Sequence, residues 1–364
     1  MRVAVTLEQC WHRVPGGSAR ATLDAISAVA AHGGVEQVGV SARHRTQPPD
    51  GWRPEIPIEM LPLPRLALYD AWQRLRWPQV ERATGPVDVV HATAHVASAS
   101  RAPWVATIHD LHFLHEPEHF TRRGVSVFRR FLDLVLADAA LALCPSTATR
   151  DDCLAAGIDA ARLRVVPWGT NALRASDEDR RRVRRTYALD RPFVLFAGTI
   201  EPRKNLPRLL DAFERLGPTD TELILVGPDG WGDQDVATKV PAGTRRLGFV
   251  PTADLEALYG AAAVVAYPSL REGFGLPVLE AMAQGAAVVT SATTSTAEVA
   301  GDAALLVDPL DTDAIAGALG RVLDDPELAA RLGEAARQRA ATFTWARTAD
   351  GLVAAYRDAS GRAS

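Results

Sequence analysis

The sequence predicts an α/β protein with two doubly wound domains, each a parallel sheet covered by helices on both faces. Its 364 residues suffice for two domains of ordinary size, and an apolar content of 47% can fill a core in each. Short β-branched runs that are apolar throughout alternate with helical patterns, which is typical of strands buried on both faces of a parallel sheet. This series breaks once, at a highly charged stretch, and then starts again.

The first series fills the N-terminal part of the chain. Residues 2–8 (RVAVTLE) are typical of a buried strand, and a loop with Gly16 and Gly17 leads to a helical pattern, SARATLDAISAVAAHG, that ends at a glycine. Further strand candidates are VEQVGVSA, VDVVHAT, PWVATIHD, ALALCPS and RLRVVPWG. We assign residues 1–172 to this first domain.

Charged residues dominate the next stretch, NALRASDEDRRRVRRTYALD. We interpret residues 173–190 as a linker, with a solvated helix as the alternative. A second series follows, with strand candidates RPFVLFAG, TELILVG, TRRLGFV, VVAYPS and AAVVTS. It predicts a second domain at 191–345 and a final helix at 346–364 that packs back on the first domain. Ligands of such sheets bind at the carboxyl ends of the strands, so we expect the active site in a cleft between the domains.

Composition argues against several classes of protein. A net charge of −4 and a pI near 6.2 give no overall attraction to nucleic acid. The three cysteines are odd in number and widely spaced, which suits reduced thiols of a cytoplasmic protein. The opening MRVAVTLE lacks the features of a signal peptide, and the apolar run at 131–144 is too short to span a bilayer. We expect a cytoplasmic protein, with peripheral contact at the inner face of the membrane as an open alternative.

The stretch REGFGLPVLEAMAQG, residues 271–285, follows the strand candidate VVAYPSL. Gly273 and Gly275 allow a turn whose amides point inward, and the helix that follows adds partial positive charge, so the turn suits a phosphate. Glu272 and Glu280 could then accept hydrogen bonds from hydroxyl groups on either side of that phosphate. The alternative is that Glu280 complements the helix N-terminus and Glu272 is solvated.

A second motif is LFAGTIEPRKNLPRLLDAF, residues 195–213, where a strand ends and a helix begins. Arg203 and Lys204 follow the strand, and neighbouring cations at that position can neutralise a diphosphate. Lysine is rare in this chain, which has only two among its 40 basic residues. The alternative is a solvated basic dipeptide.

The loop with Gly16 and Gly17 lacks G-x-G-x-x-G, which argues against a dinucleotide site of the dehydrogenase type.

The histidine-rich run TIHDLHFLHEPEHF, residues 107–120, formally matches the metalloprotease pattern H-E-x-x-H at His115–His119. That pattern needs both histidines on one continuous helix, and Pro117 between them disrupts it. We therefore predict no metal site. His109 ends a strand, so we expect its side chain to point toward the cleft. The alternative is a loop histidine whose hydrogen bonds are made to Asp110 or to backbone. The other histidines of the run are assigned to an acceptor-side loop or to the surface.

The combination of Glu272, G-F-G, Pro277 and Glu280, together with the E-P-R-K-N loop, resembles the signature of retaining glycosyltransferases of family four. The resemblance extends to H-D-L at His109 and to the C-terminal FTWARTA, and so covers nearly the whole chain. It implies the GT-B fold of two Rossmann-like domains and transfer of a sugar from a nucleotide-sugar donor. The histidine run is similar to the mannosyltransferase branch, which favours GDP-mannose over a UDP-sugar.

The resemblance also implies roles for individual residues. Arg203 and Lys204 stabilise the leaving diphosphate, Glu272 holds sugar hydroxyls, and His109 orients the donor sugar. Glu280 holds the ribose. The remaining donor contacts are assigned to Gly16, Gly17, Gly198, Thr199, Phe249, Val250, Phe274, Gly275 and Leu276.

Retention without an enzymic nucleophile suits front-face attack, in which the departing phosphate takes the proton of the acceptor hydroxyl. No metal or cofactor is then expected. The acceptor could be a glycan, a lipid-linked glycan or a small molecule, and the basic stretch at 121–131 is either a solvated helix face or a membrane contact. Two alternatives stay open: another GT-B enzyme, such as a sugar phosphorylase or nucleotide-sugar epimerase, and a non-catalytic sugar-nucleotide binding protein.

Overall fold

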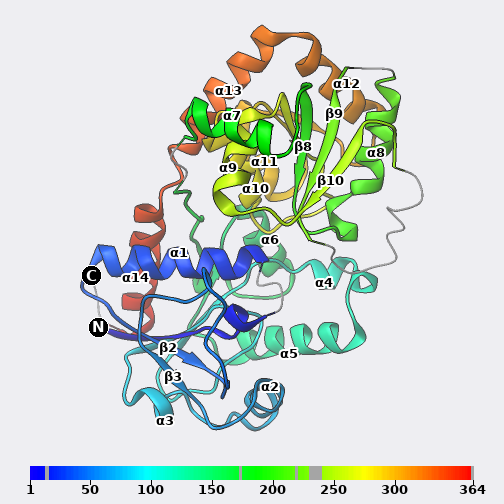
Figure 1. The fold of residues 1–364 in the computed structure, drawn as a ribbon. Coiled ribbons are helices and arrows are strands. Elements are labelled where there is room, and N and C mark those ends of the chain that lie inside the picture. Colours follow the sequence, from blue (N-terminus) through cyan, green and yellow to red (C-terminus); the bar gives the residue numbers. More distant parts are fainter. Residues whose placement is uncertain (13–15, 172–173, 218–219, 229–239, 362–364) are drawn as a thin grey trace. The chain divides into compact units, whose positions relative to one another are not determined.

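The computed structural model describes residues 1–12, 16–171, 174–217, 220–228 and 240–361. The chain forms two compact units, and Figure 1 draws its helices and strands as a ribbon coloured in sequence order. Unit 1 contains Met1–Gly169 together with Thr344–Ser364, and unit 2 is the uninterrupted segment Thr170–Phe343. Each unit is built on one parallel sheet with helices, which confirms the predicted fold class.

The sheet of unit 1 has seven parallel strands in the order β3-β2-β1-β4-β5-β6-β7. The order reverses between β1 and β4, and such a switch point is where doubly wound sheets bind ligands. The strands are β1 Arg2–Thr6, β2 Glu36–Ser41, β3 Ile58–Met60, β4 Val89–Ala92, β5 Trp104–Thr107, β6 Leu141–Cys144 and β7 Leu163–Val165. The α-helices are α1 Gly16–His32, α2 Arg65–Leu75, α3 Glu81–Thr84, α4 His112–His115, α5 Arg122–Asp138, α6 Thr147–Ala155 and α14 Trp345–Ala359. Short 3-10 helices are η1 Glu8–Trp11, η2 Pro117–His119 and η3 Ala160–Arg162.

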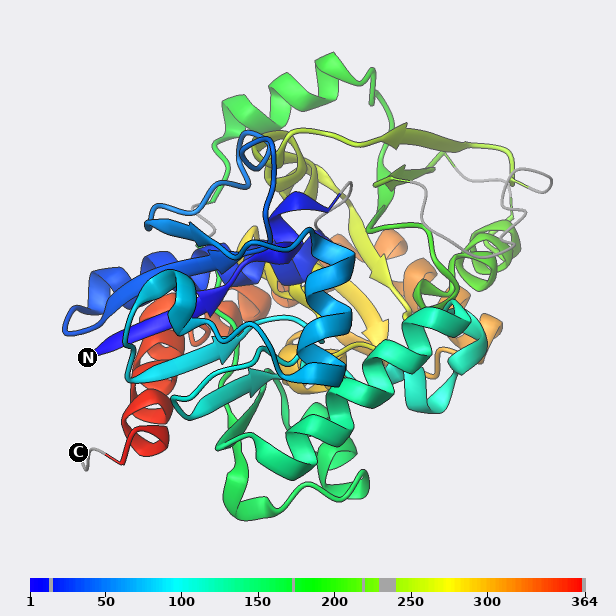
Figure 2. The same ribbon diagram turned by 90° about the horizontal axis from the view of Figure 1, so that it is seen from below.

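The C-terminal helix α14 belongs to unit 1, where it packs along α1. Figure 2 shows the red α14 beside the blue α1. A buried hydrogen bond anchors α14 to the sheet, because Nδ1 of His91 on β4 lies 2.8 Å from the hydroxyl of Tyr356. The other ring nitrogen of His91 lies 2.7 Å from the hydroxyl of Thr107 on β5. Burial, and the nearby His109, lower the pKa of His91 to about 3.

The sheet of unit 2 has six parallel strands in the order β10-β9-β8-β11-β12-β13, with its switch point between β8 and β11. The strands are β8 Phe193–Ala197, β9 Glu222–Val226, β10 Thr244–Gly248, β11 Val264–Tyr267, β12 Val288–Ser291 and β13 Leu305–Val307. The α-helices are α7 Asp177–Thr186, α8 Leu206–Arg215, α9 Thr252–Ala261, α10 Leu276–Ala283, α11 Thr294–Ala300, α12 Thr312–Asp324 and α13 Pro326–Ala340. Short 3-10 helices are η4 Pro202–Lys204 and η5 Gly301–Ala303.

The charged stretch proposed as a linker, residues 173–190, contains helix α7, which packs on α9 within unit 2. The helix begins with a capping box between Ser176 and Asp179. Asp254 of α9 lies 2.6 Å from Arg182 and 2.7 Å from the hydroxyl of Tyr187. The charges therefore mark the solvated face of a packed helix, so the boundary of unit 2 lies earlier in the chain than the sequence suggests.

Within the described ranges, no helix is both long and apolar enough to cross a membrane.

Candidate active site

The predicted phosphate-binding motifs meet at the switch point of unit 2. The loop after β8 carries Arg203 and Lys204, and the loop after β11 carries Glu272. The two loops are tied by backbone, since the N–H of Leu270 donates to the carbonyl of Arg203 over 2.8 Å. Their side chains therefore lie together at the carboxyl edge of the sheet.

Asn205 fixes the end of the first loop. Its φ of 58° is the left-handed conformation that asparagine tolerates better than most residues, and it lets the chain turn from η4 into α8. The buried side-chain amide of Asn205 donates to the carbonyls of Pro268 and Pro309 over 2.9 and 2.7 Å. These bonds join the loops after β8, β11 and β13.

Glu272 bridges the two cations. One carboxylate oxygen lies 2.7 Å from Nη1 of Arg203, and the other lies 2.6 Å from Nζ of Lys204. Arg203 also pairs with Glu201, over 2.6 Å from Nε. Glu201, Lys204 and Glu272 are buried, while Arg203 is half-buried. Two cations and two carboxylates thus balance in charge, which is how buried ionic groups are accommodated.

Opposing effects set the ionisation of this cluster. Burial would raise the pKa of Glu272, but the charges of Arg203 and Lys204 outweigh it and lower the pKa to about 2. Burial and the neighbouring Arg203 lower the pKa of Lys204 from its ordinary value, against the attraction of Glu272. Glu272 is therefore a permanent anion at neutral pH and accepts hydrogen bonds only.

Tyr267, the last residue of β11, contacts Lys204 through its hydroxyl and its ring. The ammonium donates to the Tyr267 hydroxyl and lies 5.0 Å from the ring centroid. Burial first, and then the negative charge of Glu272, raises the pKa of Tyr267 well above its ordinary value. The phenol therefore stays protonated and holds the lysine in place without adding charge.

The turn before α10 is shaped for close backbone approach. Gly275 has φ of 103°, and a Cβ at this position would lie 3.1 Å from Cγ2 of Thr296. The hydroxyl of Ser295 donates to the carbonyl of Glu272 over 2.8 Å, which fixes the start of the turn. Helix α10 begins directly after Gly275, so its positive end lies next to the Glu272 loop.

Glu280 lies one turn into α10 and is half-buried. Its Oε2 accepts a hydrogen bond from the hydroxyl of Tyr259 on α9 over 3.4 Å. Burial raises the pKa of Tyr259 well above its ordinary value, so the tyrosine is a fixed donor. The carboxylate thus has one anchored side and is not a freely solvated surface group.

The other predicted donor contacts differ in exposure. Phe249, directly after β10, is 77% exposed, whereas its neighbour Val250 is buried. Phe274 is buried against Phe343, with ring centroids 5.9 Å apart. The residues Gly198, Thr199 and Leu276 are half-buried. Trp231 and Lys239 lie outside the described residues.

In unit 1, His109 follows β5 at the carboxyl edge of the sheet. Its Nε2–H donates to the carbonyl of Thr93, after β4, over 2.8 Å, so Nδ1 is the acceptor of the neutral ring. The ring of His109 lies 5.8 Å from that of His95 and 6.0 Å from that of Trp168. Burial, and then the neighbouring His95, lower the pKa of His109 to about 4, so the ring is neutral at pH 7.

Gly16 and Gly17 open helix α1 in unit 1. Gly16 has φ of 71°, so the turn into the helix uses the left-handed freedom of glycine.

The family models cover both units. Residues 15–174 match the model described as Glycosyltransferase Family 4, and residues 177–339 match Glycosyl transferases group 1. The O-antigen chain mannosyltransferase B of Escherichia coli is 36% identical over 269 residues, which are 70% of this chain and 70% of that protein. The chain belongs to glycosyltransferase family four. It is accordingly a retaining glycosyltransferase that takes a sugar from a nucleotide-sugar donor.

Further relatives and solved structures are also similar to this chain. The D-inositol 3-phosphate glycosyltransferase of Nocardia farcinica is 37% identical over 217 residues, 55% of this chain and 48% of that protein. Among solved structures, Anabaena HepE in complex with UDP and glucose matches with a TM-score of 0.76 at 21% identity, covering 97% of this chain and 98% of the other. The lipopolysaccharide glycosyltransferase WaaG matches at 0.73 and 19%, covering 97% and 98%. These structures confirm the GT-B fold.

Sequence reasoning about this family-four enzyme missed three supporting residues. Glu201 stands inside the quoted motif, yet its pairing with Arg203 is visible only in three dimensions. Tyr267 and Tyr259 are buried aromatics whose hydroxyls contact Lys204 and Glu280. A buried tyrosine usually finds a partner for its hydroxyl, which is the one signal that could have flagged them.

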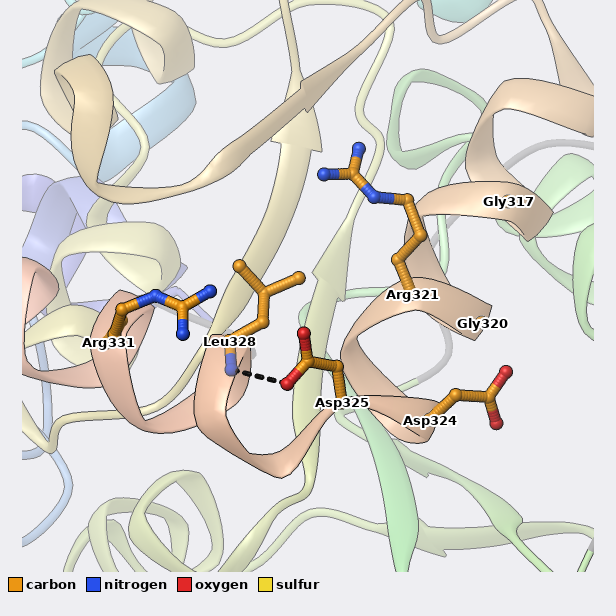
Figure 3. Close-up of a pocket in the computed structure, with 7 residues that line it drawn as sticks. All are labelled: Gly317, Gly320, Arg321, Asp324, Asp325, Leu328 and Arg331. Carbon is orange, nitrogen blue, oxygen red and sulfur yellow. Dashed lines mark hydrogen bonds between the residues drawn. The ribbon is translucent and has the colours of Figure 1, made fainter.

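A surface hollow of about 540 Å³ lies where α12 meets α13 (Figure 3). It is lined by Gly317, Gly320, Arg321, Asp324, Asp325, Leu328 and Arg331. Asp325 already caps α13 by accepting the N–H of Leu328 over 2.8 Å. None of the site residues assigned in this family-four enzyme lines the hollow, so we do not place the donor there.

Proposed function

We propose that this enzyme transfers mannose from GDP-mannose to a hydroxyl group of a glycan, a lipid-linked glycan or a small-molecule acceptor. Mannose appears in the names of two relatives, the Escherichia coli protein and the MMP alpha-(1->4)-mannosyltransferase of Mycolicibacterium hassiacum, which is 35% identical over 210 residues, 55% of this chain and 49% of that protein. The UDP and glucose of HepE belong to a structure only 21% identical. These two names support mannose as the transferred sugar, and the similarity of the histidine run to the mannosyltransferase branch supports GDP-mannose as its donor.

The shared carboxylate of Glu272 between Arg203 and Lys204 is the observation that carries this proposal. When the bond from the anomeric carbon to the diphosphate breaks, negative charge grows on the leaving group. Arg203, Lys204 and the start of α10 would stabilise that charge. In this proposal the donors of Arg203, Lys204 and the start of α10 act at the diphosphate in place of a divalent ion.

Proton transfer follows from the same arrangement. The acceptor hydroxyl attacks the face from which the diphosphate leaves, and an oxygen of the departing phosphate takes the hydroxyl proton. The new glycosidic bond forms as the sugar–phosphate bond breaks, so configuration is retained. Glu272, held ionised by its two cations, would accept hydrogen bonds from sugar hydroxyls while the chemistry proceeds.

Two further contacts complete the assignment of the donor. Glu280, anchored on one side by Tyr259, would hold the ribose hydroxyls. His109 would contact the donor sugar, and its tautomer defines how: Nε2–H is engaged by Thr93, so Nδ1 is the atom available to accept a hydroxyl proton in a hydrogen bond. Gly16, Gly17, Gly198, Thr199, Gly275 and Leu276 would offer backbone to the diphosphate, with Phe249, Val250 and Phe274 around the base.

A donor screen tests the function directly. The full chain is incubated with GDP-mannose, UDP-glucose and related sugars, first in a thermal-shift assay and then with acceptor panels. GDP-mannose should raise the unfolding temperature most and should yield a mannoside with retained anomeric configuration. A larger shift and faster transfer with a UDP-sugar would overturn the donor assignment.

The same assay separates other GT-B chemistries. A sugar phosphorylase would consume phosphate and release a sugar phosphate, and an epimerase would change the donor sugar without forming a glycoside. Either product pattern in place of a mannoside would overturn transfer as the reaction.

We place the reaction in the cytoplasm, supported by three buried free thiols at Cys10, Cys144 and Cys153. Helix α5 exposes four arginines along one side, which we assign to a solvated face: Arg122, Arg123, Arg129 and Arg130. Binding of the chain to anionic vesicles, lost in a variant with these arginines neutralised, would assign the face to a membrane instead.

A further inference from the structure

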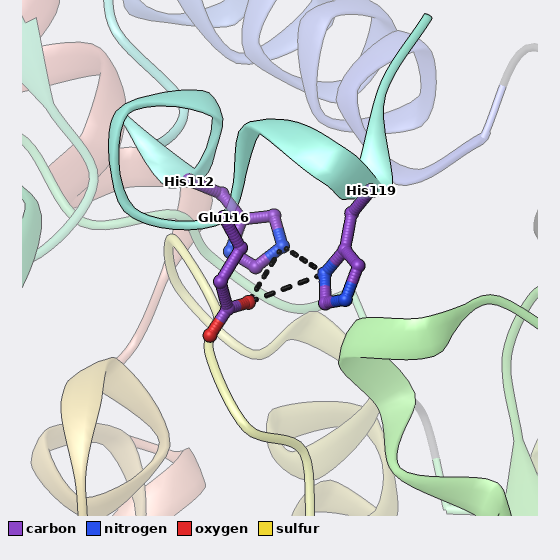
Figure 4. Close-up of side chains that lie close together, drawn as sticks. All are labelled: His112, Glu116 and His119. Carbon is purple, nitrogen blue, oxygen red and sulfur yellow. Dashed lines mark hydrogen bonds and ion pairs between the residues drawn. The ribbon is translucent and has the colours of Figure 1, made fainter.

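Three side chains of unit 1 that take no part in the proposed reaction converge on one point (Figure 4). They are His112, Glu116 and His119. Nε2 of His112 and Nδ1 of His119 are 3.2 Å apart, and each lies 3.2 Å from Oε2 of Glu116. The two nitrogens and the oxygen form an equilateral triangle.

The break at Pro117 creates this convergence. In a continuous helix, residues seven apart are separated by about 10 Å along the axis, so His112 and His119 could not meet. Helix α4 ends at His115, Glu116 leaves the helical conformation at φ −134° and ψ 66°, and η2 brings His119 back over His112. The proline that argues against a metalloprotease helix therefore builds a different cluster.

The formal H-E-x-x-H pair is separated in the same step. His115 is not part of the triangle, and its Nε2 lies 3.1 Å from Oδ1 of Asp152 on α6. His112, which the sequence assigns to a loop or the surface, is instead buried, with a side chain 2% exposed. The three residues whose side chains converge are thus His112, Glu116 and His119.

We propose that these three residues form a binding site for a divalent transition metal of the zinc type. Two ligand atoms bound to one tetrahedral zinc at about 2.0–2.1 Å are about 3.3–3.4 Å apart, close to the edges of the triangle. Two imidazoles and one carboxylate are ligands that zinc uses, with a water molecule in the fourth position.

Hydrogen bonds between the three side chains explain the triangle less well than a bound metal ion does. Each ring nitrogen carries at most one proton, so with an ionised carboxylate no more than two of the three 3.2 Å edges can be hydrogen bonds. A cation just above the triangle interacts with all three lone pairs at once. The surroundings favour such an ion, because Oε2 of Glu116 is a buried atom and the side chains of Glu116 and His119 are 32% and 21% exposed. The site is therefore enclosed yet reachable from solvent.

The position of the site suggests a structural role. Residues 112–119 follow the strand end that carries His109 by only a few residues, and His112 N–H donates to Asp110 over 3.0 Å. A bound ion would fix the turn between α4 and η2, and with it the segment that follows His109 in the chain. The diphosphate chemistry assigned to unit 2 does not depend on this ion.

Zinc binding by the full chain tests the site. The protein is stripped with a chelator and titrated with Zn²⁺ by calorimetry, without any nucleotide sugar. We expect one ion per chain, a rise in unfolding temperature on addition of zinc, and tetrahedral visible bands with Co²⁺. His119→Asn and Glu116→Gln should each weaken zinc binding at least about tenfold.

His115→Asn is the matched control, because His115 lies in the same helix and outside the triangle. It should bind zinc like the wild-type chain. Circular dichroism shows whether each variant is folded, and the partly exposed Glu116 and His119 are chosen over the buried His112 for this reason. Absence of binding by the wild-type chain, or equal binding by the His119 and Glu116 variants, would overturn the proposal. Both results are independent of transferase activity.

Discussion

Glu272 and Lys204 form a buried ion pair, with Oε1 of the carboxylate 2.6 Å from Nζ of the lysine. Because burial of either charge alone is costly, removing one partner leaves the other incompletely compensated. We expect Lys204→Met and Glu272→Gln each to lower the free energy of unfolding by on the order of 3 kcal/mol. The double variant should lose clearly less than the sum, as measured by chemical denaturation. Additive losses would show that the two side chains are not coupled.

Arg203 should matter more for rate than for stability, since it is half-buried and we propose that it stabilises the leaving diphosphate. Arg203→Ala should lower kcat about 100- to 1000-fold, as expected when a donor to a developing negative charge is removed. Arg203→Lys should restore part of the rate, because it keeps the charge without the fork. Arg215→Ala, at an exposed ion pair on α8, is the control and should be active. Comparable rates for Arg203→Ala and this control would exclude the assigned role.

Glu280 is expected to act in nucleotide binding. Glu280→Ala should weaken the affinity for GDP about 10- to 100-fold, since a charge-assisted hydrogen bond to the ribose is lost. Tyr259→Phe removes only the hydroxyl that orients Glu280 and should cost less. Calorimetry with GDP measures both. An unchanged affinity in Glu280→Ala would mean that the ribose lies elsewhere.

Acid should destabilise unit 1 through its buried neutral histidines. The folded pKa of His91 is about 3, against about 6.5 in the unfolded chain, so the unfolded state binds more protons between these values. Stability is therefore full above pH 6.5 and falls as the pH decreases. From pH 7 to pH 5 the loss for one such ring is about 2 kcal/mol.

His91→Gln separates this effect from the titration of Glu272. The pKa of Glu272, about 2 when folded, moves stability only below pH 4.5. Denaturation at pH 7 and pH 5 should thus show a smaller difference for His91→Gln than for the wild-type chain. The same pH dependence in both would exclude His91 as the source.

Local patterns predicted much of this fold and site. The strands with continuous β-branched runs, the glycine turn at Gly275 and the basic loop at Arg203 are all visible as short segments. The strands β3 and β13 were not predicted, because each is only three residues long and partly exposed, without a buried run. The charged stretch at α7 resembles a linker because only Val183 is buried in that helix.

Contacts between distant residues could not be predicted. Glu272 lies 68 positions from Lys204, so their pairing depends on the order of β8 and β11 in the sheet. The approach of His119 to His112 depends on the angle that the chain takes at Glu116. Neither of these two contacts can be derived from the composition of the chain.

The discontinuity of unit 1 has a consequence for the order of folding during synthesis. Unit 2 is one unbroken segment, whereas unit 1 needs α14, which leaves the ribosome after all of unit 2. Until then α1 lacks the helix that packs along it, and His91 lacks the hydroxyl of Tyr356. Domains usually complete folding in the order of their synthesis, from the N-terminus. Here the second unit is the first that can be finished, and the nascent first unit must wait with an apolar face uncovered.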